Sequence, residues 1–194
     1  MILFLFVLGL ILGSLAVKFL NYQQKKELIE CFSQSIGQME QLLATQTSFV
    51  VRRIILANLK LVFVFWVFSI FGIGVVLVPG LILLRGFIIG FTVGFLVNEM
   101  FFRGIGIVFV AILPQNLLFI PGLISGGVFS VVFAYKSILK LAVDYKNNKA
   151  QILQGLWRYT LVMLAVGIVM LGSGLVEAYL TPRLISWLVP FLIE

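Results

Sequence analysis

Histidine is absent from the sequence, and cysteine and aspartate each occur once. Without histidine the chain cannot build the H-E-x-x-H site of metalloproteases, or the Ser-His-Asp and Cys-His groups that activate a nucleophile. Asp144 is the single aspartate, so one chain cannot supply an aspartate dyad. The G-x-x-x-x-G-K-[ST] loop that binds nucleotide phosphates is also missing. We therefore expect a protein that is not an enzyme, with no catalytic residue, no metal and no cofactor. The lone Cys31 cannot form a disulfide within the chain.

Charged residues are scarce as well. They make up 11% of the chain, whereas 62% of the residues are hydrophobic; a soluble domain has roughly 45–50% apolar and about 25% charged residues. The composition predicts an all-α, polytopic membrane protein with about five transmembrane helices in a single integral membrane domain, residues 1–194. The predicted spans lie at about 2–20, 61–79, 86–102, 104–136 and 159–180, with Arg85 in the turn after Pro79-Gly80. The first span is expected to be an uncleaved anchor, because it lacks the basic start of a signal peptide.

The net charge is nevertheless +7. The basic residues lie between or beside apolar runs, so membrane lipid is the expected partner, and no nucleic-acid-binding motif is present. Residues 21–60 form the longest polar segment. Leu28, Phe32, Ile36 and Met39 recur there at three- and four-residue steps, which is typical of an amphipathic helix on the membrane surface. Lysines and arginines are expected on both sides of the membrane, so their count does not determine which side the N-terminus lies on.

The fourth predicted span contains an interruption. A straight helix over residues 104–136 would measure about 50 Å, well beyond a hydrocarbon core of about 30 Å. Pro114 and Pro121 lack the N–H that continues a helix, so we expect a discontinuous helix, broken between Leu113 and Gly122. Gln115 and Asn116 bring hydrogen-bonding amides to this polar break, where freed carbonyls need partners.

Small residues at four-residue spacing mark a second feature. They let two helices approach closely, either within one chain or between subunits, so a homodimer is one of the alternatives. The candidate helix-packing glycines are Gly86, Gly90, Gly94, Gly122 and Gly126.

Three charged residues belong to the predicted spans or their ends. Glu99 and Arg103 are four residues apart and would pair on one helical face, as a plain interfacial ion pair or as a polar contact to the next segment. Glu177 lies near the end of the last span, where an ionisable group is usually paired or functional. We expect it to pair within the chain, with Arg183, Arg103 or the backbone at Pro114, and so to tie the last span to the broken helix.

Four stretches carry a family resemblance: GFTVGFLVNEM (90–100), LPQNLLFIPG (113–122), RYT (158–160) and EAYLTP (177–182). In their order and spacing they resemble the stage II sporulation protein M family, over most of the chain. The family also has a polar cytoplasmic segment before its first span, which this sequence does not contain.

The resemblance implies a non-enzymatic membrane scaffold for engulfment during sporulation. It implies a multi-pass protein of the mother-cell and septal membrane, with a cytoplasmic N-terminus. The partners that it implies are stage II sporulation proteins D and P, two peptidoglycan-degrading proteins that are anchored by membrane segments. The residues themselves leave a rival open, because a discontinuous helix with amides at membrane depth is also how transporters build polar sites.

Overall fold

The computed structural model describes the backbone of residues 1–143 and 149–180. It describes the side chains of these residues except at positions 32–33, 35–50, 102–103, 111, 139–143 and 149–152. The part of the chain so described is helical and contains no strand. Five of its helices are long and apolar enough to cross a membrane, which confirms the all-α, five-span prediction. These candidate spans are Ile2–Phe19, Val51–Ile70, Gly74–Phe101, Leu113–Ile138 and Leu153–Leu180.

The helices follow one another with short connections. In chain order they are α1 (Ile2–Ala16) with a 3-10 turn η1 (Val17–Phe19), α2 (Tyr22–Ile70), α3 (Gly74–Ile107), a π-helical turn η2 (Val108–Ile112), α4 (Leu113–Val143), α5 (Lys149–Leu175) and a second π-helical turn η3 (Val176–Leu180). Each helix buries one face and leaves large apolar side chains exposed on the other, as expected where lipid is the solvent.

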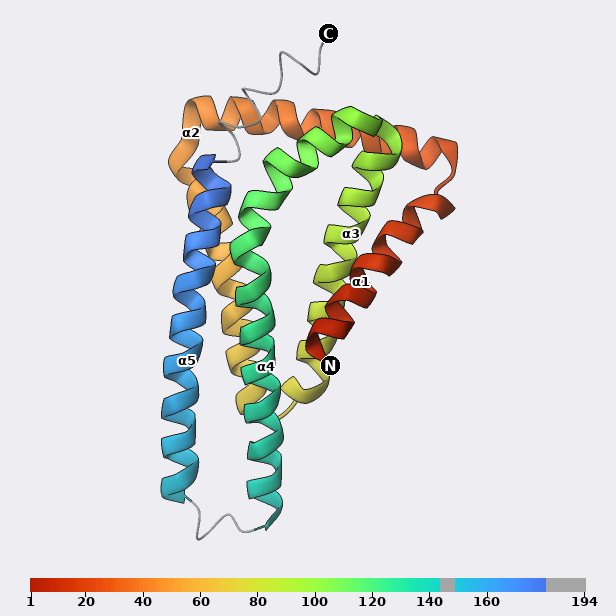
Figure 1. Cartoon of the computed structure of the whole chain (residues 1–194). Helices are drawn as coiled ribbons and strands as arrows, with labels where there is room; N and C mark the ends of the chain where they lie inside the picture. The colour runs from red at the N-terminus through yellow and green to blue at the C-terminus, as the bar shows by residue number, and fades with distance from the viewer. Residues whose placement is uncertain (144–148, 181–194) are drawn as a thin grey trace.

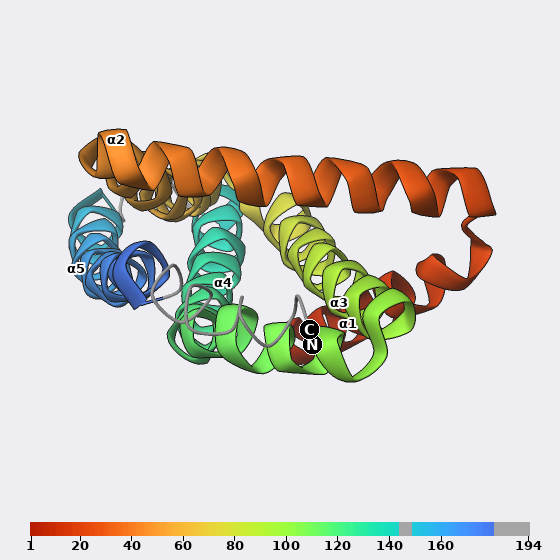
Figure 2. The same ribbon diagram turned by 90° about the horizontal axis from the view of Figure 1, so that it is seen from above.

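Helix α2 is a single helix whose two halves lie in different parts of the bundle. Asn21 caps its start, and the Asn21 N–H donates to the side-chain oxygen of Gln24 at 3.0 Å. Its first half crosses one end of the bundle, and its second half turns alongside α4 and α5 (Figures 1 and 2). The predicted division into a polar segment 21–60 and a span 61–79 is therefore wrong in its bounds, because the span begins within the same helix, at Val51.

The turn between the second and third spans also differs from the prediction. It lies at Phe71–Ile73, where Gly72 has a positive φ of 76° that costs glycine little. Pro79 is instead accommodated inside α3. The third span therefore starts at Gly74 instead of residue 86, and Arg85 lies within it.

The predicted break between Leu113 and Gly122 is wrong. Helix α4 runs without interruption from Leu113 to Val143, with Pro121 inside it. Pro114 falls in its first turn, where a missing N–H is tolerated. The irregular backbone lies upstream, at Phe101 (φ 45°, ψ −121°) and in the π-helical turn η2. There the chain crosses the end of the bundle before α4 descends (Figure 1).

All five helices contribute to one apolar core. Its most buried large side chains include Phe65, Ile82, Leu123 and Met170. Helix α1 packs along α3, and α5 packs against both α4 and α2. Seen from above, α4 stands between α3 and α5 (Figure 2). This position of α4 brings polar groups from three helices to one place.

Candidate functional site

The contact between α4 and α5 contains a polar junction at the start of α4. The hydroxyl of Ser173, which is 1% exposed, donates to the main-chain oxygen of Gln115 at 3.1 Å. The side-chain oxygen of Gln115 is itself buried, and no donor among the described residues reaches it. Its neighbour Asn116 donates its amide to the carbonyl of Ile112 at 2.7 Å, within the π-helical turn. Asn116 thus donates to a carbonyl of the irregular backbone, as was expected of the amides at positions 115 and 116. The side-chain oxygen of Gln115 accepts no hydrogen bond from the described residues.

Two charged residues lie beside this junction. Phe119 follows Gln115 by one turn of α4, and the guanidinium carbon of Arg85 lies 5.6 Å from the centroid of the Phe119 ring, a cation–π distance. Glu177 follows Ser173 by one turn on the neighbouring helix. Its side chain is half-buried. We call Arg85, Gln115, Ser173 and Glu177 the intramembrane polar cluster.

Arg85 and Glu177 do not touch. The salt bridge between Lys25 and Glu99 is the one direct ion pair among the described side chains. Helix α4 stands between the helices that carry them, which explains this separation (Figure 2). An ionisable group without a direct ion partner inside a span is costly.

Arg85 was expected in a turn and lies instead within the third span. Of the partners predicted for Glu177, Arg183 lies outside the described residues, and so does the side chain of Arg103. The tie between the last span and the start of α4 exists, but Ser173 makes it. A lone arginine within the apolar run 74–101 is the signal that would have identified Arg85.

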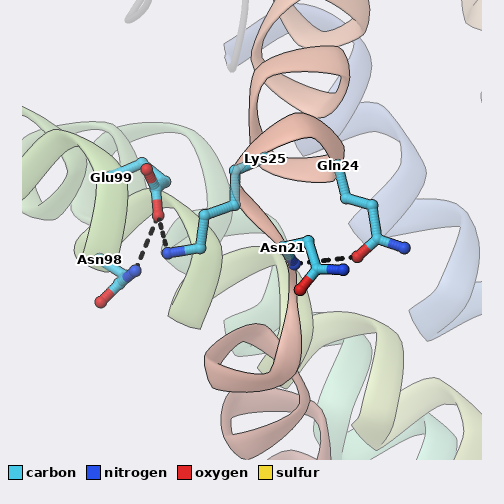
Figure 3. Close-up of polar contacts among 5 residues, drawn as sticks. All are labelled: Asn21, Gln24, Lys25, Asn98 and Glu99. Atoms are coloured by element: carbon cyan, nitrogen blue, oxygen red, sulfur yellow. Dashed lines mark hydrogen bonds and ion pairs between the residues drawn. The ribbon is translucent and has the colours of Figure 1, made fainter.

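Glu99 has a partner different from the predicted one. Its carboxylate oxygen lies 2.7 Å from the ammonium nitrogen of Lys25, at the start of α2, and also accepts from Asn98 at 2.7 Å (Figure 3). The predicted pairing with Arg103 assumed a continuous helix. The non-helical backbone of Phe101 lies between the two residues, and the side chain of Arg103 lies outside the described residues, so this pairing stays a prediction. Glu99 therefore fastens the end of α3 to the helix that crosses the bundle.

The candidate glycines all pack within the chain. Gly86, Gly90 and Gly94 face the backbone of α1; a Cβ atom at Gly90 would stand 2.7 Å from the Cα of Leu10. Gly122 and Gly126 face side chains of α5 instead. The sequence allowed these glycines to pack either within one chain or between subunits, and the structure shows packing within one chain. A homodimer stays a prediction, and this stripe of glycines is not free to hold a second copy.

A second set of buried polar contacts surrounds Tyr159, and these residues were not predicted to meet. The hydroxyl of Tyr159, from the RYT stretch, lies 2.9 Å from the hydroxyl of Ser130 and donates to the carbonyl of Phe65 at 3.2 Å. Its ring stacks on Phe133 at 4.2 Å between centroids. These contacts join α2, α4 and α5 in the core. They are satisfied internally, so they describe a structural element of the bundle.

The described residues hold no group of three metal-ligating side chains of the His, Cys, Asp and Glu types. The intramembrane polar cluster therefore combines one guanidinium, one carboxylate, a hydroxyl and an amide oxygen. Such groups can form hydrogen bonds and charge contacts, and they are the candidate functional site of the described chain.

Comparison with known proteins gives one match. No curated protein and no solved structure shows significant similarity to the chain. The family model described as "Stage II sporulation protein M" matches residues 2–182, which include all five candidate spans and every described residue of the polar cluster. The chain therefore belongs to the stage II sporulation protein M family and is a multi-pass membrane protein of sporulation.

Proposed function

We propose that the protein is a non-enzymatic scaffold of the engulfment machinery. It recruits the peptidoglycan-degrading stage II sporulation proteins D and P and anchors them at the septal membrane of the mother cell, with its own N-terminus in the cytoplasm. The observation that carries this proposal is the family match over residues 2–182.

We place the docking site for a partner's membrane segment on an outward face of α5. Ala165, Ile168 and Gly172 lie at i, i+3 and i+7 on α5, Ile168 is 68% exposed, and a Cβ atom at Gly172 would meet nothing within 4 Å. Small residues on an outward face allow another helix to approach closely. Unlike the glycines between α1 and α3, Gly172 remains open to such an approach.

Co-purification from sporulating cells in mild detergent tests the scaffold. The wild-type chain is expected to bring down both hydrolases. Gly172→Leu should reduce their recovery about tenfold, which corresponds to about 1.4 kcal/mol of binding free energy. Gly80→Leu is the matched control, because Gly80 is equally open but lies on α3. Absence of both hydrolases with the wild type contradicts the scaffold, and equal recovery with both variants contradicts the docking face.

A transport-like membrane component is the second candidate. The observation that favours it is the intramembrane polar cluster, since polar groups inside spans are how transporters build their sites. One variant distinguishes the two candidate functions. Arg85→Gln should leave hydrolase recovery unchanged if the cluster serves transport, while abolishing engulfment.

A further inference from the structure

Exposed basic and aromatic side chains gather at the end of the bundle opposite the first half of α2. Tyr135 on α4 and Trp157 on α5 are 57% and 68% exposed. The next residue in each helix, Lys136 and Arg158, is an exposed cation. We call these four residues the basic aromatic belt. Tyrosine and tryptophan beside lysine and arginine are typical of the boundary between lipid and water.

The packing of α4 on α5 sets the two cations of the belt at one level. The ring of Phe133 stacks on that of Tyr159 with centroids 4.2 Å apart, so these two residues lie at the same height. The two helices are antiparallel (Figure 1), and Lys136 and Arg158 lie three residues and one residue from this contact, both toward the end where α4 stops and α5 starts. At 1.5 Å per residue their backbones differ in height by about 3 Å, which is less than one helical turn.

The turn between α2 and α3 places this level at the edge of the membrane. A Cβ atom at Gly72, in that turn, would stand 3.0 Å from Cγ1 of Ile138, which is two residues beyond Lys136. The candidate spans Val51–Ile70 and Gly74–Phe101 meet at the same turn. The backbone of Lys136 therefore lies about 3 Å inside the level of the turn. This is the region where lipid headgroups meet the acyl chains.

The two ends of the bundle differ in their balance of charge. At the end that α2 crosses, cations and carboxylates are mixed, and Lys25 pairs directly with Glu99. Around the belt, the described side chains include no carboxylate at positions 61–84, 128–138 and 153–165. The positive charges of the belt are therefore not offset by a described anion of the chain.

We infer that the basic aromatic belt binds anionic phospholipids in preference to zwitterionic ones. The ammonium of Lys136 and the guanidinium of Arg158 donate to phosphate oxygens. The rings of Tyr135 and Trp157 pack beside the upper acyl chain and the glycerol of the same leaflet. A zwitterionic headgroup brings its own cation close to its phosphate and so competes with these donors, whereas phosphatidylglycerol brings none. Each cation near the surface of an anionic leaflet contributes about fivefold to the preference.

The exposed indole of Trp157 reports directly on the lipid that surrounds the belt. The purified full chain is reconstituted in phosphatidylcholine vesicles that contain increasing fractions of phosphatidylglycerol or phosphatidylcholine brominated on the acyl chains. Bromine quenches tryptophan fluorescence on contact, so the two quenching curves give the relative affinity for the two lipids. Trp157→Phe is measured in parallel, and the difference from wild type isolates Trp157 from the other two tryptophans.

At low salt the Trp157 signal should favour phosphatidylglycerol by about fivefold or more. The preference should shrink in about 1 M salt, where the Debye length falls to about 3 Å. Equal quenching by the two lipids in the wild-type chain overturns the inference, whatever any variant does.

Substitutions assign the preference to the two cations. Lys136→Gln combined with Arg158→Gln should bring the two affinities to within about twofold of each other. Lys136→Arg combined with Arg158→Lys keeps both charges and should retain the preference. Lys26→Gln removes an exposed cation at the opposite end and is the control for net charge. A full preference in the double glutamine variant, or an equal loss with Lys26→Gln, overturns the assignment to the belt.

Discussion

Gly90 on α3 lies against the backbone of Leu10 on α1, whereas Gly126 on α4 lies against the side chain of Val166 on α5. Both pairs of helices use glycine, but only the first brings two backbones together. A Cβ atom at Gly13 of α1 would likewise stand 2.7 Å from the main-chain nitrogen of Phe91. A side chain such as Val166 can rotate away, whereas a helix backbone cannot.

The two contacts also differ in polarity. Hydrogen bonds join α4 and α5 at two levels of their contact, from Ser173 to the Gln115 carbonyl near the start of α4 and between Tyr159 and Ser130 near its middle. The α1–α3 contact relies on the close fit of small residues. In lipid, where no hydrophobic force draws helices together, these are the two available means of association. The comparison predicts that bulk disrupts the first contact most, and loss of a hydroxyl weakens the second.

The largest effect is expected from Gly90→Leu. The new side chain would have to occupy the position of the α1 backbone, so α1 must move away along its length. We expect a loss of about 3 kcal/mol or more in the free energy of unfolding, measured by SDS titration in mixed micelles. Gly80→Leu, at an open position on the same helix, should be near wild type. Equal effects of the two variants would show that the α1–α3 contact tolerates bulk.

Removing the hydroxyl at Tyr159 should weaken the other pair. Tyr159→Phe loses the contact to Ser130 and the bond to the Phe65 carbonyl while keeping the ring that stacks on Phe133. The expected loss in unfolding free energy is about 1–2 kcal/mol. Tyr135→Phe on α4 is the control, since its side chain is exposed. A wild-type midpoint for Tyr159→Phe would mean that these buried bonds contribute nothing net to the bundle.

The glycine contact was partly readable in the sequence. Four-residue spacing of Gly86, Gly90 and Gly94 predicted close helix approach, because side chains four apart share a helical face. Its partner was not identified, although Gly9 and Gly13 in the first span have the same spacing. Spacing describes one helix at a time, and the choice of partner depends on how the whole bundle packs.

The polar cluster was less readable. Pro79-Gly80 looked like the stronger turn signal, so Arg85 was placed outside the span, and its contact with the Phe119 ring could not be foreseen. The actual turn uses the positive φ of Gly72, and local sequence does not decide which glycine adopts it. Likewise the positive φ of Phe101 was not foreseen, because no residue type signals such a conformation in advance.

Alanine at matched glycines sharpens the comparison further. Alanine in place of glycine favours a helix by about 1 kcal/mol. At Gly126 the added Cβ meets Val166 Cγ1 at 3.0 Å, a group that can shift, so Gly126→Ala should remain within about 1 kcal/mol of wild type. At Gly94 it meets the Cα of Ser14 at 2.9 Å, and Gly94→Ala should fall below Gly126→Ala by about 1 kcal/mol. Indistinguishable stabilities would show that α1 shifts as readily as a side chain does.

The smallest effect is expected at the end of α3, beyond the glycine contact. Lys25 and Glu99 form an ion pair whose side chains are 24% and 19% exposed, so solvent screens part of their attraction. Lys25→Gln should therefore cost about 0.5 kcal/mol, and added salt should shrink the difference from wild type. Lys26→Gln, at an exposed neighbouring lysine, is the control for the change in net charge. A double-mutant cycle with Glu99→Gln isolates the pair. A coupling above about 2 kcal/mol would show that charge, and not the fit of small residues, chiefly holds this side of the bundle together.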